Sequence, residues 1–134
     1  MNEDYFGKYE WQNKTILIVE DDLSSSFFLK EILLETEANL LFAADGREAI
    51  EVSREHPEID VVLMDIQLPL LNGYETTREI KKIYPELPVI AQTAYAFQSD
   101  KEKCFEAGCI DYITKPIETT LLLDKIADVI NHGT

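Results

Sequence analysis

Short apolar segments and longer segments with helical periodicity alternate along most of the chain. The apolar runs cover residues 16–19, 40–43, 61–64, 89–91 and 112–113. Continuous apolar runs of this length are typical of strands buried on both faces of a parallel sheet. Apolar residues recur every three or four positions in the segments between them, at residues 24–35, 46–55, 74–84, 99–107 and 119–131. The pattern therefore predicts five strands that alternate with five helices.

Polar residues at the ends of these segments support the predicted helices. Asp22 and Asp45 stand where an N-cap residue is expected. Ser99 and Glu102 have the spacing of a capping box, and Gly108 follows as a helix stop. Alternating strands and helices favour right-handed crossovers, so we expect an α/β fold with one doubly wound parallel sheet and helices on both faces. We assign residues 1–14 to an N-terminal arm, 15–131 to the domain and 132–134 to a C-terminal tail.

Composition and charge narrow the class of protein. The 134 residues suffice for one domain, and the 46% apolar content is that of a globular chain. A net charge of −14 disfavours binding to nucleic acid and to anionic membranes. The acidic N-terminus does not resemble a signal peptide, and no apolar run is long enough to span a bilayer. We expect a cytoplasmic protein in which Cys104 and Cys109 are reduced thiols, because their spacing matches neither a redox pair nor a zinc knuckle.

Candidate chemistry lies at the carboxyl ends of the predicted strands, which meet at one edge of a parallel sheet. The residues that follow the first, third, fourth and fifth strands include four carboxylates, a hydroxyl and a lysine: Glu20, Asp21, Asp22, Asp65, Thr93 and Lys115. Asp22 is explained by a helix cap. Asp65 is not, because a loop of eight residues separates it from the next helix.

Asp65 at the end of a buried strand and beside other acids predicts a cation site. Neighbouring like charges disfavour the ionised form of each carboxylate, and a bound cation relieves this. A small set of hard oxygen ligands suits Mg²⁺, which keeps several waters and accepts phosphate oxygens. Lys115 adds a point charge that can pair with Asp65 and then with an anion.

The motifs around these residues resemble a known family. They are, in order, Ile16-Leu17-Ile18-Val19-Glu20-Asp21-Asp22, Val62-Leu63-Met64-Asp65-Ile66-Gln67-Leu68-Pro69, Asn72-Gly73-Tyr74-Glu75, Ala91-Gln92-Thr93-Ala94-Tyr95-Ala96, Ala107-Gly108 and Asp111-Tyr112-Ile113-Thr114-Lys115-Pro116. Over residues 15–131 the chain resembles the receiver domain of response regulators in two-component signalling. The stretch at residues 91–96 is especially similar to receivers of hybrid histidine kinases, so the chain is either a stand-alone receiver or one from such a kinase.

The resemblance implies a fold and a set of roles. The fold is the flavodoxin-like receiver fold with strand order 2-1-3-4-5. Asp65 is the implied phosphoacceptor, and Lys115 and Thr93 contact the phosphoryl group. Glu20, Asp21 and Asp65 hold Mg²⁺ together with the backbone carbonyl of Gln67. Thr93 and Tyr112 form the implied switch, and the Lys115–Pro116 peptide is expected to be cis.

The implied function is a phosphoacceptor signalling switch of a phosphorelay, a phosphoprotein rather than an enzyme. Its expected partners are a histidine kinase or a histidine phosphotransfer protein, and a second copy bound through the fourth and fifth helices. A metal-dependent phosphohydrolase with Asp65 as nucleophile is the alternative. That chemistry calls for a second acid at position 67, where the chain has Gln. The intact set of acids, Thr93 and Lys115 argues against a domain that has lost phosphorylation.

Overall fold

The computed structural model describes residues 9–94 and 97–132. Most of the predicted arm (1–8), residues 95–96 of the fourth motif and the tail residues 133–134 lie outside this description. The described residues form five strands and five helices, with bounds β1 Thr15–Val19, α2 Leu23–Leu34, β2 Asn39–Ala43, α3 Gly46–Glu55, β3 Val61–Asp65, α4 Gly73–Ile83, β4 Val89–Thr93, α5 Gln98–Ala107, β5 Asp111–Thr114 and α6 Thr119–His132. The predicted alternation is thus confirmed, although β3 and β4 extend to include Asp65 and Thr93.

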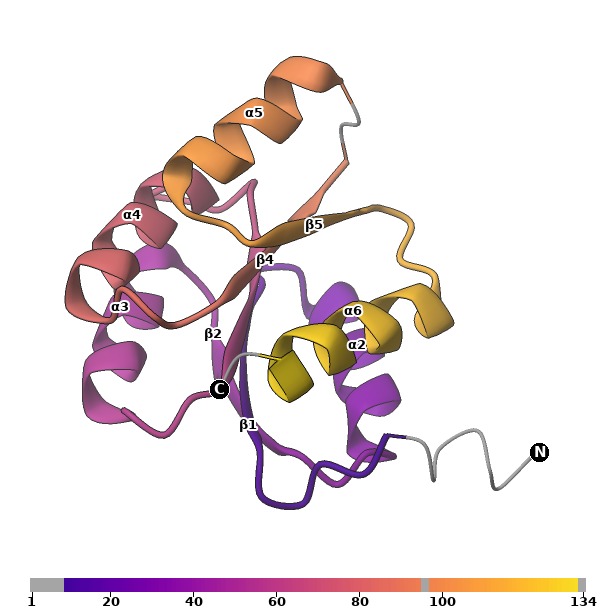
Figure 1. Ribbon diagram of the computed structural model, residues 1–134. Helices are drawn as coiled ribbons and strands as arrows, with labels where there is room; N and C mark the ends of the chain where they lie inside the picture. Colours follow the sequence, from indigo (N-terminus) through magenta and orange to yellow (C-terminus); the bar gives the residue numbers. More distant parts are fainter. Residues whose placement is uncertain (1–8, 95–96, 133–134) are drawn as a thin grey trace.

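The sheet is parallel throughout, with strand order β2-β1-β3-β4-β5 (Figure 1). The expected order 2-1-3-4-5 is therefore confirmed. Strand β1 lies between β2 and β3, so the direction of winding reverses at β1. In sheets of this kind the crevice outside the strand ends at the reversal point is where ligands bind.

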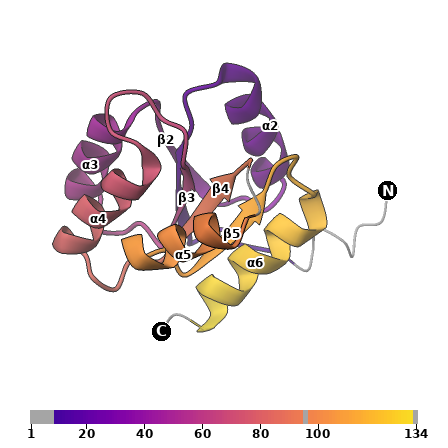
Figure 2. The same ribbon diagram turned by 90° about the horizontal axis from the view of Figure 1, so that it is seen from above.

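Helices cover both faces of the sheet (Figure 2). Helices α2 and α6 pack on one face over a cluster that includes Ile18, Leu63 and Leu122. Helices α3, α4 and α5 pack on the other over a cluster that includes Leu17 and Met64. The central strands are buried on both faces, which explains their uninterrupted apolar sequence. In the described part of the chain, no helix is both long enough and apolar enough to cross a membrane.

The N-terminal ends of the helices agree with two predicted caps and contradict the predicted capping box. Asp22 and Asp45 are N-caps, accepting hydrogen bonds from the backbone N–H groups of Ser25 and Glu48. The capping box predicted at Ser99 and Glu102 is wrong, because α5 begins one residue earlier and its N-cap, Phe97, makes no side-chain cap bond. A capping box does begin α4. There the Asn72 side chain accepts from the backbone N–H of Glu75 at 2.9 Å, and Glu75 accepts from that of Asn72 at 3.2 Å.

Part of the predicted arm belongs to the core. Tyr9 and Trp11 are buried and lie in the cluster under α2 and α6, with their rings edge to face at 5.8 Å. The backbone N–H of Trp11 donates to the carbonyl of Thr36 at 2.8 Å. Two aromatic side chains supply much apolar area, so residues 9–11 contribute to the stability of the domain. The domain boundary at residue 15 stays a prediction, while His132, assigned to the tail, is the last residue of α6.

Candidate phosphoryl and metal site

The strand ends bring the predicted site residues to one edge of the sheet. Glu20 and Asp21 follow β1, Asp65 ends β3, Thr93 ends β4 and Lys115 follows β5. The register places Asp65 beside Gln92, and Thr93 beside Thr114. Residues separated by up to 95 positions in sequence therefore meet because parallel strands all end on the same side.

Asp65 is held in a tightly packed turn. Its carboxylate is buried, and its Oδ1 accepts a hydrogen bond from the backbone N–H of Gln67 at 3.1 Å. The start of α4 packs directly against this turn, with the N–H of Gly73 bonded to the carbonyl of Ile66 at 2.9 Å. A Cβ on Gly73 would lie 2.4 Å from the carbonyl oxygen of Asp65, so only glycine permits this approach. The glycine of the Asn72-Gly73 motif thus fixes the position of Asp65.

The carboxylate of Glu20 is buried, and its surroundings do not fully compensate its negative charge. Its Oε2 accepts from the backbone N–H of Asp22 at 3.2 Å, whereas Oε1 has no hydrogen-bond partner among the described residues. Burial disfavours the charged form, and the adjacent Asp65 adds to this, so the pKa of Glu20 rises to about 7. A buried carboxylate oxygen without a hydrogen bond is costly, and a nearby cation is the partner that suits it best.

Lys115 supplies positive charge to both buried acids. Its Nζ lies 3.4 Å from Asp65 Oδ2 and 3.5 Å from Glu20 Oε1. The backbone N–H of Lys115 donates to the carbonyl of Thr93 at 2.8 Å, which ties the lysine to the end of β4. The Lys115–Pro116 peptide is cis, as expected. One ammonium group therefore faces two carboxylates, and the net charge of this trio is negative when both acids are ionised.

Three acids fit a hard divalent cation. Oxygen atoms of Glu20, Asp21 and Asp65 all lie within 4.8 Å of one another, and Asp21 is exposed to solvent while the other two are buried. This combination offers protein oxygens on one side and room for water on the other, as Mg²⁺ requires. The backbone of Gln67 is adjacent through its N–H contact with Asp65, and the use of its carbonyl as a further ligand stays a prediction.

The two predicted switch residues lie on neighbouring strands, where the register pairs Tyr112 with Ala91, two residues before Thr93. Thr93 is buried at the acidic edge. Tyr112 lies on the edge strand β5, half-buried, with its ring edge to face with Phe105 at 6.2 Å. The Nζ atoms of Lys101 and Lys125 lie 5.3 Å and 5.6 Å from the centre of that ring. Tyr112 is therefore held between α5 and α6, where a change of its rotamer would alter the surface of both helices.

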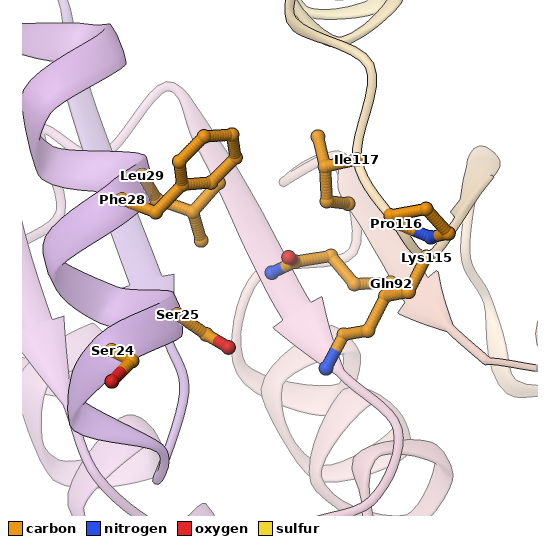
Figure 3. Close-up of a pocket in the computed structure, with 8 residues that line it drawn as sticks. All are labelled: Ser24, Ser25, Phe28, Leu29, Gln92, Lys115, Pro116 and Ile117. Carbon is orange, nitrogen blue, oxygen red and sulfur yellow. The ribbon is translucent and has the colours of Figure 1, made fainter.

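Glu20, Asp21, Asp65 and Lys115 are together called here the acidic site. A cavity of about 350 Å³, which the sequence does not predict, adjoins this site (Figure 3). It lies between α2 and the segment after β5, and its apolar wall includes Phe28, Leu29 and Ile117. Gln92 is 1% exposed and extends into the cavity, and its Nε2 has no hydrogen-bond partner among the described residues. The signal that could have revealed it is one polar residue within the otherwise apolar run before Thr93.

Comparison with known proteins gives a consistent match. A family model described as the response regulator receiver domain matches residues 16–127. The chain is 35% identical over 115 residues to the polar-differentiation response regulator DivK of Brucella ovis, covering 84% of this chain and 93% of DivK. It is 37% identical over 119 residues to hybrid signal transduction histidine kinase I of Dictyostelium discoideum. That match covers 83% of this chain but only 7% of the kinase.

Solved structures agree with the sequence comparison. The receiver domain of the sensor histidine kinase PA1611 from Pseudomonas aeruginosa, solved with a magnesium ion in its active-site cleft, is 35% identical with a TM-score of 0.82. The superposition covers 89% of this chain and 98% of that one. A structure of the Saccharomyces cerevisiae histidine phosphotransfer protein Ypd1 with the receiver domain of Ssk1 is 30% identical, with a TM-score of 0.81 and coverage of 87% and 88%.

Proposed function

This chain belongs to the response regulator receiver domain family of two-component and phosphorelay signalling, and on that premise we propose that Asp65 accepts a phosphoryl group from a phosphohistidine. The observation that carries the proposal is the buried meeting of Asp65, Glu20 and Lys115 at the sheet edge. The family is one of signalling domains, and we infer a phosphoacceptor rather than an enzyme. The phosphohydrolase alternative is not favoured, since Gln67 offers no acidic side chain.

The transfer needs little beyond position and charge. A carboxylate oxygen of Asp65 forms a bond to phosphorus while the P–N bond to the partner's imidazole breaks, through a loose transition state. Lys115 is placed to pair with the phosphoryl oxygens, and the Thr93 hydroxyl lies on the neighbouring strand end. Mg²⁺ held by Glu20, Asp21, Asp65 and the Gln67 carbonyl would supply the remaining charge neutralisation. Rigid packing by Gly73 keeps the attacking carboxylate in place.

Removing the acceptor tests this directly. Incubation with acetyl phosphate and Mg²⁺ should label the parent protein, and Asp65→Asn should abolish labelling because the nucleophilic oxygen pair is lost. Asp60→Asn is the matched control, since Asp60 lies just before the other end of β3, where it accepts a hydrogen bond from the Thr15 N–H. Full labelling of Asp65→Asn in intact-mass measurements would refute the assignment.

We further propose that the phosphohistidine partner docks on α2 beside the cavity. This helix has apolar residues on its buried side and also on its solvent side, where Leu23, Phe27 and Phe28 are exposed. The cavity lined by Phe28 and Gln92 continues this surface as far as Lys115 (Figure 3). An exposed apolar patch next to the reacting carboxylate suits a protein donor, and Gln92 offers it a buried hydrogen-bond donor.

The docking proposal separates protein donors from small ones. We expect Phe27→Ser, which replaces a side chain 62% exposed, to slow transfer from the histidine kinase or phosphotransfer protein that profiling of the source organism identifies. Labelling by acetyl phosphate should not change, because the exposed side chain of Phe27 is not part of the cluster of Glu20, Asp21 and Asp65. Phe105→Ser on the opposite face of the sheet is the control. Equal slowing by both variants, or none by Phe27→Ser, would place docking elsewhere.

The output is proposed to leave by the face formed by α5, Tyr112 and α6, called here the output face. Phosphorylation adds charge and acceptor oxygens at Asp65, which Thr93 is placed to meet from the neighbouring strand. The occupant we propose is a second copy, because the output face carries both acids and bases, such as Asp111 and Lys125, beside exposed apolar residues such as Phe105.

Free thiols and the absence of a spanning helix from the described residues are compatible with action in the cytoplasm.

A further inference from the structure

The end of α5 brings Cys104 and Cys109 together. Gly108 adopts φ 111°, and its N–H donates to the carbonyl of Phe105 at 3.1 Å. The N–H of Cys109 donates to the carbonyl of Cys104 at 3.0 Å. These two bonds define a Schellman motif, which places the two cysteines at its outer positions, and their side chains interact there. A separation of five residues, which matches no linear redox motif, thus becomes a close pair.

The two thiols share one buried environment against α4. Cys104 is 1% exposed and Cys109 is 4% exposed, and neither is in a disulfide. Cys109 Sγ lies 4.0 Å from the hydroxyl of Thr77. Hydrogen bonding from Cys109, with a further contribution from Tyr74, lowers the pKa of Cys104 to about 7, while interaction with Cys104 and burial raise the pKa of Cys109. Cys104 is therefore the cysteine that forms a thiolate, and Cys109 keeps its proton and donates a hydrogen bond to it.

We propose that Cys104 and Cys109 form an intramolecular disulfide when the protein meets a peroxide. The Cys104 thiolate attacks the peroxide, so that an S–O bond forms, the O–O bond breaks and one water leaves after protonation. Cys109 then attacks the sulfenic sulfur, its proton leaves with the oxygen as a second water, and the S–S bond forms. Two thiols and one hydrogen peroxide give one disulfide and two waters.

The backbone geometry already suits the bond. The N–H of Cys109 is bonded to the carbonyl of Cys104 and the two thiols already interact, so the pair needs little rearrangement to form the bond. Burial restricts the reaction to small oxidants and makes it slower than that of an exposed thiol. Reversible disulfides in reducing compartments are characteristic of redox sensing, and a reductant such as thioredoxin or glutathione would restore the thiols.

The position of the pair gives oxidation a consequence, which rests on the proposed function. Residues 104–112, called here the α5–β5 junction, include Phe105 and Tyr112, whose rings contact each other. A disulfide across residues 104 and 109 would fix the last turn of α5 to the segment that leads into β5. The oxidised domain should therefore still accept phosphate at Asp65 while its output face no longer responds.

The first experiment tests the disulfide alone. The folded protein is treated with hydrogen peroxide, denatured, and exposed to iodoacetamide. We expect both thiols to become resistant to alkylation, with recovery after dithiothreitol, and a peptide map that joins Cys104 to Cys109. Cys104→Ser and Cys109→Ser should each leave no intramolecular bond. Two alkylated cysteines after prolonged oxidation of the parent protein would overturn the proposal.

A backbone variant tests the role of the Schellman motif. Gly108→Ala forces a side chain into left-handed backbone and toward Lys81, whose Cγ would lie 3.2 Å from the new Cβ. We expect it to oxidise several-fold more slowly than the parent, as it retains both cysteines but loses the geometry that pairs them. An unchanged rate would mean that the motif does not bring the thiols together.

The second experiment separates the disulfide from its consequence. Reduced and oxidised protein are each labelled with acetyl phosphate, and self-association is followed by analytical ultracentrifugation. We expect equal labelling and loss of the phosphorylation response only in the oxidised parent, with Cys104→Ser unaffected by peroxide. A normal response of the oxidised protein would refute the coupling. Failure of the reduced protein to be labelled would instead refute the role of Asp65.

Discussion

The acidic site and the α5–β5 junction differ in how deeply their polar groups are buried and in which contacts stabilise them. At the acidic site Glu20 and Asp65 are buried at the ends of central strands and share a single lysine. At the junction Tyr112 lies on an edge strand, half-buried, and its ring is held by one aromatic edge and two cations more than 5 Å away. The first region is closely packed and its negative charge is incompletely neutralised, whereas the second is stabilised by weak contacts.

This difference suits the acidic site to the phosphorylation reaction and the α5–β5 junction to the conformational response. Buried groups on strand ends keep their geometry, and their uncompensated charge favours binding of a cation and a phosphoryl group. Ring and cation contacts are each worth about 1 kcal/mol or less, so they can be exchanged when the charge nearby changes. The following predictions test the contrast through pH, metal and mutation.

The largest effect concerns Glu20 in the metal-free protein. Its pKa is raised from 4.5 to about 7, so between these pH values the folded state binds more protons than the unfolded state. The free energy of unfolding should therefore fall as pH rises from about 4.5 to about 7, by up to about 3 kcal/mol from this group. Urea denaturation in EDTA should show this fall in the parent protein and a much flatter profile in Glu20→Gln.

A neighbouring carboxylate provides the control for this pH dependence. Asp22 is exposed, and hydrogen bonds from Ser25 lower its pKa below 3.8, so it does not titrate in the same window. Asp22→Asn, which keeps an N-cap side chain, should retain the slope of the parent protein. A parent slope that survives Glu20→Gln would show that the burial of Glu20 does not govern the pH response.

A smaller effect is expected from added Mg²⁺. At a concentration ten times the Kd, binding to the folded state should stabilise it by about 1.4 kcal/mol, seen as a rise in Tm. Asp21→Asn should remove most of this rise, since it deletes the exposed member of the three-acid cluster. Asp22→Asn should preserve it, because Asp22 caps α2. Loss of the rise in both variants would indicate a general effect of charge.

The smallest effect on stability is expected at Tyr112. Replacement by Leu keeps apolar contact but removes the ring interactions with Phe105, Lys101 and Lys125, at a cost of about 1 kcal/mol. We expect Tyr112→Leu to be labelled normally at Asp65 yet to lose phosphorylation-dependent self-association.

Thr93 offers a matched pair for the same response. Thr93→Ala should be labelled but fail to respond, whereas Thr93→Ser, which keeps the hydroxyl, should behave like the parent. Analytical ultracentrifugation with and without acetyl phosphate measures both. Full responses from Tyr112→Leu and Thr93→Ala together would mean that the signal leaves by another face.

Much of the fold could be predicted from local patterns. Buried strands appear as apolar runs, and the caps at Asp22 and Asp45 are local because each side chain bonds to a backbone N–H three residues on. The capping box predicted at Ser99 and Glu102 is wrong because spacing alone does not place the start of a helix. Ser99 and Glu102 have the required spacing, but packing starts α5 at Gln98, so Ser99 lies inside the helix.

Other features depend on neighbours far away in the sequence. The lack of periodicity in residues 1–14 predicts an arm, yet Tyr9 and Trp11 are buried among core residues from distant elements. The sequence shows Gln92 only as a polar residue before Thr93, whereas the structure places it in the cavity between α2 and the segment after β5, with no hydrogen-bond partner for its Nε2 among the described residues. Cys104 and Cys109 became a pair only through the left-handed turn at Gly108.

The residues that can react are evident from the amino-acid sequence. Parallel strands all end at one edge, so an acid, hydroxyl or lysine placed just after a strand must lie near the others. The protonation and the positions of those residues depend on the three-dimensional packing. Burial beside Asp65 raises the pKa of Glu20, and the approach of Gly73 fixes the turn that holds Asp65. The physical reason is that desolvation and close packing depend on groups brought together in space, which local sequence patterns do not encode.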